Sequence, residues 1–154
     1  MKERWRPIGV LAGVLFGINV VARLVSRFAF GENTEMQDRL SLAMFTVIGL
    51  ILATLAFVQG RRRPLPEWSG EVALSVLIAM VLTIFVGPFV NGSHPFAAGA
   101  GAFFSQIWLY AGFTAGGVIL GYLLLTAFGL DHRSQSLKRF AEASRAKPRR
   151  PVRR

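Results

Sequence analysis

Four long apolar stretches separate the charged residues of this 154-residue chain, and they constrain its fold more than any other feature. The stretches lie at about 7–30, 40–59, 71–90 and 101–128. Each is close to the roughly 20 residues that an α-helix needs to cross a ~30 Å hydrocarbon layer. Because they lack strict alternation of apolar and polar residues, strands are disfavoured. The sequence predicts an all-α integral membrane four-helix transmembrane bundle over residues 1–130, followed by a basic segment over 131–154.

The composition agrees with a membrane domain. Hydrophobic residues make up 53% of the chain and charged residues only 17%, which is too apolar for an ordinary soluble domain. The absence of cysteine excludes disulfides, thiolate metal sites and cysteine nucleophiles. Arginine outnumbers lysine fifteen to three, which suggests a high-GC bacterial genome. The first stretch is longer than the apolar region of a signal peptide and lacks an A-x-A cleavage site, so we expect a retained helix.

Lysine and arginine are distributed unevenly between the two sides that these helices define. Fifteen of them fall in the N-terminal tail, the second loop and the C-terminal tail, whereas Arg23, Arg27 and Arg39 fall on the other side. The positive-inside rule then places both termini in the cytoplasm. Trp5 and Trp68 fall at the same cytoplasmic interface, where indoles are enriched. The expected location is the bacterial plasma membrane (the cell inner membrane), with a multi-pass topology.

Glycines recur in two of the predicted helices at a spacing that permits close helix packing. The first helix carries Gly9, Gly13 and Gly17, and the fourth carries Gly112, Gly116, Gly117 and Gly121. Small residues let helices approach closely in lipid, where no hydrophobic effect drives them together. The favoured interpretation is packing of the first helix against the fourth within one chain. The alternative is a homodimer face, or a docking face for another membrane subunit.

A polar stripe borders the glycines of the first helix. Asn19, Arg23 and Arg27 spread over roughly 80° of the helix surface at 100° per residue. Arg23 lies about 24 Å beyond Pro7 at 1.5 Å per residue. One interpretation is that the arginines reach lipid phosphates, or pair with Glu32, Glu35 or Asp38 just past the helix. The other is a binding site for an anion, an acidic lipid or a partner carboxylate, because an intramembrane ionisable residue is a functional candidate.

Basic residues cluster on the predicted cytoplasmic side. The second loop carries Arg61, Arg62 and Arg63, and the tail carries Lys138, Arg139 and Arg145. Apolar or small residues at helical spacing predict a short amphipathic helix that ends before Pro148. These residues are Leu137, Phe140, Ala141 and Ser144. We expect contact with anionic lipids at ~1 kcal/mol per base. An acidic protein partner is second, and nucleic acid is disfavoured because Phe140 alone could stack on a base. Residues 148–154 are predicted to be disordered.

No catalytic constellation is recognisable. His94 and His132 lie on opposite predicted sides of the membrane, so they cannot share a metal or form a dyad. No P-loop, dinucleotide fingerprint or nucleophile elbow is present. Acidic residues lie only at the ends of the predicted spans, as Glu71 and Asp38 do, which argues against a cation-coupled exporter that depends on a buried carboxylate. The sequence therefore predicts a non-enzymatic protein with no cofactor and no metal site.

Two functions fit these features. The favoured one is an accessory or scaffolding subunit of a larger bacterial membrane complex, which its glycine faces would join. The alternative is a small homo-oligomeric transporter or channel, with Asn19, Arg23 and Arg27 biasing an outward vestibule toward anions. The inner halves of the predicted helices offer few polar side chains for a conduction path, which favours the accessory subunit.

Gln106 of the fourth helix is predicted to lie at the depth of Arg23 and to contact Arg23 or Asn19. Gln106→Leu should then lower the stability or the association of the bundle, by about 1 kcal/mol, because an interhelical hydrogen bond is lost. Unfolding in detergent measures the loss. An unchanged unfolding midpoint together with unchanged association would count against the contact.

Overall fold

The computed structural model describes residues 2–30 and 34–146, and every regular element within them is helical. The elements in chain order are α1 (Lys2–Val25), the π-helix η1 (Ser26–Phe30), α2 (Thr34–Arg62), α3 (Leu65–Val81), the π-helix η2 (Leu82–Val86), α4 (Gly87–Val90), α5 (Gly99–Ala127) and α6 (His132–Ala146). Four helices are long and apolar enough to cross a membrane. This confirms the predicted all-α class and the membrane character of the chain. Helices satisfy all their backbone hydrogen bonds internally, as lipid requires.

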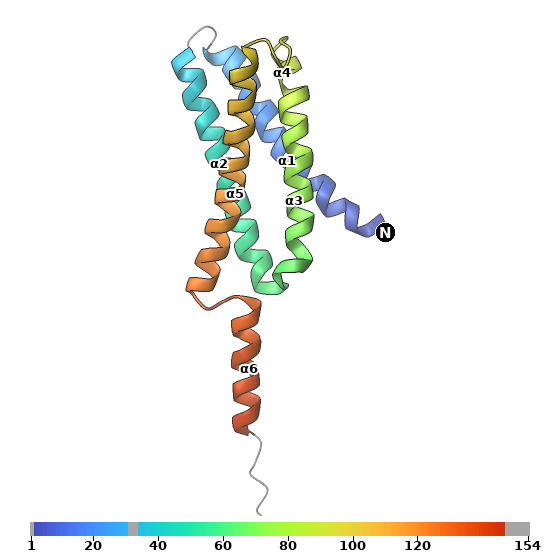
Figure 1. The fold of residues 1–154 in the computed structure, drawn as a ribbon, viewed down its shortest axis with the longest axis vertical. Coiled ribbons are helices and arrows are strands. Elements are labelled where there is room, and N and C mark those ends of the chain that lie inside the picture. The colour runs from blue at the N-terminus through green and yellow to red at the C-terminus, as the bar shows by residue number, and fades with distance from the viewer. Residues whose placement is uncertain (1, 31–33, 147–154) are drawn as a thin grey trace, which may run out of the picture.

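The bundle has two distinct ends (Figure 1). The α4 end holds α4, the last turns of α1 and the first turns of α2 and α5. The α6 end holds the turn between α2 and α3 and the end of α5, from which α6 extends away from the bundle. Helix α1 crosses the others obliquely, so its first turns leave the bundle at the side. Residues 148–154, for which the sequence predicts disorder, lie outside the residues that the structure describes.

The helices pack as two pairs, α2 with α5 and α1 with α3. At the α2–α5 contact, a Cβ on Gly117 would meet the backbone of Gly49, and a Cβ on Gly121 would meet the backbone of Ala53. Within the described residues α1 makes no contact with α5, so the predicted packing of the first helix on the fourth is wrong. The physical reason is that α2 offers small residues opposite the α5 glycines, which lets the two backbones touch.

The core between the pairs is apolar. Leu15, Ile48, Leu52 and Tyr110 are fully buried in it, and the Tyr110 ring lies edge-on to a neighbouring phenylalanine of α2, with ring centroids 6.2 Å apart. Two of the buried hydroxyl groups bond to their own helix: Ser75 Oγ donates to the Glu71 carbonyl at 2.7 Å, and Thr114 Oγ1 to the Tyr110 carbonyl at 2.7 Å. Such bonds satisfy the hydroxyls without opening a polar path between helices.

The connection between α2 and α3 is much shorter than the loop expected over residues 60–71. Only Arg63 and Pro64 separate the two helices. Pro64 caps α3 in an extended conformation, with φ −64° and ψ 148°. Pro66 falls in the first turn of α3, where its missing N–H leaves no helical bond unmade. Prolines that resemble loop residues in the sequence therefore start a helix here.

Gly121→Ala should destabilise the bundle by about 1–3 kcal/mol, because the added methyl group overpacks the α2 backbone. Gly112→Ala on the same helix is the matched control, since a Cβ there meets nothing within 4 Å. Unfolding of both variants by heat or by denaturing detergent compares them. Equal stability of the two variants would contradict the close α2–α5 contact.

Candidate functional site

A cavity of about 570 Å³ lies at the α4 end, between residues of α1, α2, η2 and α5. We call it the α4-end cavity. The polar side chains that matter most in its lining are Asn19, Arg23, Asp38, Ser41, Thr83 and Gln106. Three of the residues singled out from the sequence, Asn19, Arg23 and Gln106, thus surround one space. Its volume falls in the range of small-molecule binding sites.

Arg23 is held in place by a short chain of hydrogen bonds between α1 and α2. Its Nε–H donates to Asn19 Oδ1 at 2.9 Å. Asn19 is only 2% exposed, and its Nδ2–H donates to Met44 Sδ of α2 at 3.2 Å. An Nε–H bond uses one of the five N–H donors of a guanidinium. Within residues 2–30 and 34–146, no carboxylate forms an ion pair with Arg23.

Gly87 brings the backbone of the third membrane-length helix, the span Leu65–Val90 made of α3, η2 and α4, against the Arg23–Asn19 pair. A Cβ at Gly87 would lie 2.8 Å from Arg23 Nε and 3.0 Å from Asn19 Oδ1. The Gly87 N–H bonds to the carbonyl of Leu82, five residues earlier, which is the bond of a π-turn. Pro88 follows and cannot donate the next helical bond. The third span continues past Gly87–Pro88 as α4 and ends at Val90, where the apolar stretch 71–90 also ends.

Thr83 is a cavity-lining residue that the sequence reasoning missed. Its side chain is 3% exposed and lines the cavity. Its hydroxyl finds no partner among the described residues, unlike the hydroxyls of Ser75 and Thr114, which bond to their own helices. A buried unpartnered hydroxyl calls for an explanation, such as a bound group that completes it. Thr83 sits in η2, and π-turns often occur at functional sites. Pro88 five residues later was the available sequence signal.

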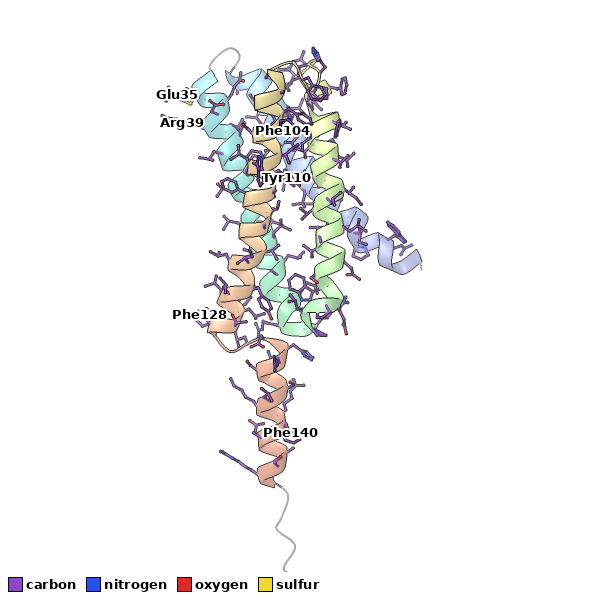
Figure 2. All side chains as sticks on the ribbon, in the orientation of Figure 1. Glu35, Arg39, Phe104, Tyr110, Phe128 and Phe140 are labelled. Carbon is purple, nitrogen blue, oxygen red and sulfur yellow. The ribbon has the colours of Figure 1, made fainter. Side chains whose placement is uncertain are left out.

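The other predicted members of the polar stripe lie elsewhere. Arg27 is exposed and donates to the Val90 carbonyl at 3.1 Å, which ties η1 to α4. Glu35 pairs with Arg39 at 2.7 Å on the outside of α2 (Figure 2). Asp38 lines the cavity instead of pairing with Arg23. Glu32, the third expected acidic partner, lies outside the described residues.

Gln106 shares the cavity with Arg23 and Asn19, but no hydrogen bond joins it to either of them in the described part of the chain. The three residues therefore share one lining, without a hydrogen bond from Gln106 to the other two. The reason is that α5 packs on α2 and not on α1, so its side chains face α1 across the cavity. A ligand in that space could touch all three residues.

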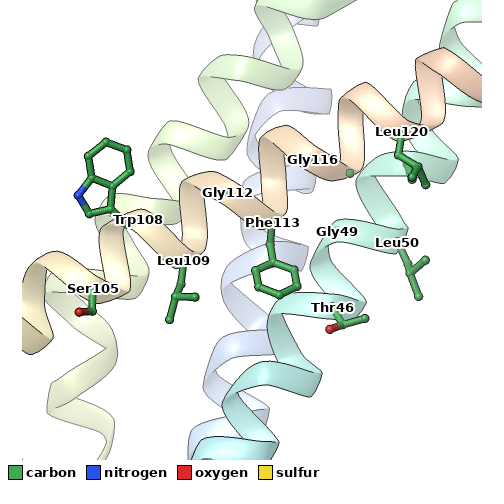
Figure 3. A pocket seen from close by; sticks show the side chains of 12 residues that line it. Thr46, Gly49, Leu50, Ser105, Trp108, Leu109, Gly112, Phe113, Gly116 and Leu120 are labelled. Atoms are coloured by element: carbon green, nitrogen blue, oxygen red, sulfur yellow. The ribbon is translucent and has the colours of Figure 1, made fainter.

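Most of the predicted packing glycines face outward. A Cβ on Gly9, Gly13, Gly17, Gly112 or Gly116 would meet nothing within 4 Å. Gly112 and Gly116 line an open groove of about 840 Å³ along α2 and α5, which also includes Thr46 and Trp108 (Figure 3). The inward-facing partners on α2, Gly49 and Ala53, were not singled out, although their four-residue spacing is the same small-residue signal.

The basic residues lie at and beyond the α6 end. Arg61 and Arg62 line a cavity of about 370 Å³ together with Gln135 of α6. Arg63 approaches Glu71 at 4.0 Å. In α6, Leu137 and Phe140 are exposed beside Lys138, Arg139 and Arg145, and Phe140 lies in the part of α6 that extends beyond the bundle (Figure 2). The positive charge of the described residues is thus concentrated opposite the α4-end cavity.

Gly87→Ala should destabilise the protein by about 1–3 kcal/mol, because its methyl group collides with the Arg23–Asn19 pair. Gly70→Ala is the control in the same span, since a Cβ there has open space. Alanine should be neutral or stabilising at that helical position. Thermal unfolding of both variants in neutral detergent measures the difference. A Gly87→Ala protein as stable as Gly70→Ala would refute the close approach.

The α4-end cavity therefore combines a positioned guanidinium, a buried hydroxyl without a partner, an amide and a carboxylate. Comparison of the chain with models of protein families, with curated proteins and with solved structures finds no match. The chemistry of this cavity and the outward glycine faces are the features from which a function can be inferred.

Proposed function

We propose that this protein is a non-enzymatic accessory subunit of a bacterial membrane complex, and that it binds a small anionic group in the α4-end cavity. The anion-binding proposal rests on one observation, a positioned Arg23 guanidinium that has no carboxylate partner among the described residues. Asn19 fixes its Nε–H at 2.9 Å, it lines a cavity, and no carboxylate of the described residues pairs with it.

A partly buried guanidinium without a counter-ion is costly, because it has left water without gaining an opposite charge. A carboxylate or a phosphate would supply that charge and accept charge-assisted hydrogen bonds from the guanidinium. Thr83 and Gln106 line the same cavity and supply further donors. Because Asn19 and Met44 already hold Arg23, little side-chain freedom remains to be lost on binding.

Binding is favoured over conduction because the cavity leads into an apolar core. Leu15, Ile48 and Leu52 are fully buried beyond it. A conduction path would need polar groups or water there. The alternative, a small homo-oligomeric transporter or channel with an anion-biased vestibule, is supported by the same cavity, but it requires a path between chains or a second conformation.

The surfaces support the accessory role. The outward glycines of α1, namely Gly9, Gly13 and Gly17, offer a smooth helix face on which another membrane helix or a second copy can pack. The basic residues at the α6 end suit anionic lipids, which would place both termini in the cytoplasm and the cavity on the outer side.

Ligand protection tests the cavity. In uncharged maltoside detergent, inorganic phosphate or acetate should raise the unfolding midpoint of the wild-type protein, because a ligand at 100 times its Kd stabilises by about 2.7 kcal/mol. Arg23→Gln should abolish the shift. Arg39→Gln is the matched control, since Arg39 lies at the same end in an exposed pair with Glu35. Equal protection of all three proteins would refute the site.

A second experiment distinguishes the accessory subunit from the transporter. The protein is purified from its host under mild conditions, and mass spectrometry determines its mass and its partners. A stoichiometric foreign membrane subunit supports the accessory role. A homo-oligomer that conducts anions into liposomes, and loses this activity with Arg23→Ala, would favour the transporter instead.

A further inference from the structure

The α4-end cavity carries two opposite charges that do not neutralise each other. Arg23 and Asp38 both line it, yet they form no ion pair within the described residues. We propose that the cavity takes a small zwitterion, with its carboxylate or phosphate on Arg23 and its ammonium group on Asp38. This inference rests on the anion binding proposed above and adds the requirement for a positive charge on the same ligand.

The neighbourhood of Asp38 leaves its charge available to a ligand. The adjacent base, Arg39, is committed to Glu35 at 2.7 Å on the outer face of α2. No ion pair of Asp38 itself occurs in the part of the chain that the structure describes. Asp38 is exposed at the cavity, whereas Arg23 is half-buried beside the fully enclosed Asn19. A ligand would therefore enter with its anionic group first and leave its ammonium group at the mouth.

Helix α2 links the two charged positions. Asp38, Ser41 and Met44 recur every three residues along the side that lines the cavity, and Met44 accepts the hydrogen bond from Asn19 that steadies Arg23. Arg23 and Asp38 therefore line one space without forming an ion pair. A ligand that carries both an ammonium group and an anionic group, as in an amino acid or in phosphoethanolamine, can meet both.

Asp38 also gives the cavity selectivity. A ligand with a negative group alone gains Arg23 but is repelled by the carboxylate at the mouth. A zwitterion turns that repulsion into attraction. The volume of about 570 Å³ suits a free zwitterion or the head group of a phosphatidylethanolamine lipid that enters from the bilayer. The shared chemistry is an ammonium group joined by a short linker to a carboxylate or a phosphate.

The test uses pairs of probes that differ only in the ammonium group. They are O-phosphoethanolamine against ethyl phosphate, and β-alanine against propionate. With the full chain in uncharged detergent, protection against thermal unfolding yields an apparent Kd for each probe. The zwitterion of at least one pair should bind about tenfold more tightly than its anionic counterpart, a difference of about 1.4 kcal/mol.

Asp38→Asn should remove that preference, and it should leave the affinity for the simple anion equal or higher. Glu35→Gln is the matched control, because Glu35 lies one turn away on α2 and pairs outside the cavity; it should keep the preference. Phosphatidylethanolamine added to the micelles, compared with the free probes, distinguishes a lipid head group from a soluble ligand, and either source supports the inference.

The possible failures are distinguishable. If ethyl phosphate and propionate bind as tightly as the zwitterions in the wild-type protein, anion binding stands and the zwitterion inference is overturned. If Asp38→Asn retains the preference, the ammonium site at Asp38 is overturned. If no probe protects the wild-type protein, the anion site itself falls. Arg23→Lys, which keeps a positive charge, replaces Arg23→Gln where the latter does not fold.

Discussion

The backbone contact between α2 and α5 is the interaction on which the rest of the bundle depends. Gly117 and Gly121 rest directly on the backbone around Gly49 and Ala53, so no side chain separates the two helices there. Dispersion between closely apposed atoms is the main attraction available to helices in lipid. Since α5 is committed to α2, α1 must find its own partner in α3. The α4-end cavity lies where these two pairs meet.

At Gly87, the absence of a side chain allows a similarly close approach, here between backbone and polar side chains. Its missing side chain lets the third span pass the Arg23–Asn19 pair, which a methyl group would displace. The π-turn of η2 and Pro88 position this glycine and turn Thr83 into the cavity. Structural departures from a regular helix thus lie next to the α4-end cavity. Strained or irregular segments commonly gather at binding sites in this way.

The sequence predicted the parts that depend on one helix at a time. Four membrane-length helices follow from the apolar stretches, because lipid leaves the backbone few other choices. Asn19, Arg23 and Gln106 were singled out because polar side chains are costly inside a membrane. The four-residue spacing of glycines in the first helix did not predict which helix packs against it. Several helices carry small residues, and the three-dimensional arrangement decides which of them meet. Thr83 and Gly87 were missed because their roles depend on a π-turn and on a neighbour in another helix.

Helix α1 crosses α3 obliquely (Figure 1), and its residues Ala12 and Leu15 are buried in the core. Arg23 lies eight residues beyond Leu15, about 12 Å along the axis. Gly9 and Gly13 lie on the other side of Leu15, and Gly17 lies between Leu15 and Arg23. One continuous helix therefore carries both the guanidinium that lines the α4-end cavity and a glycine face with room for a neighbouring helix.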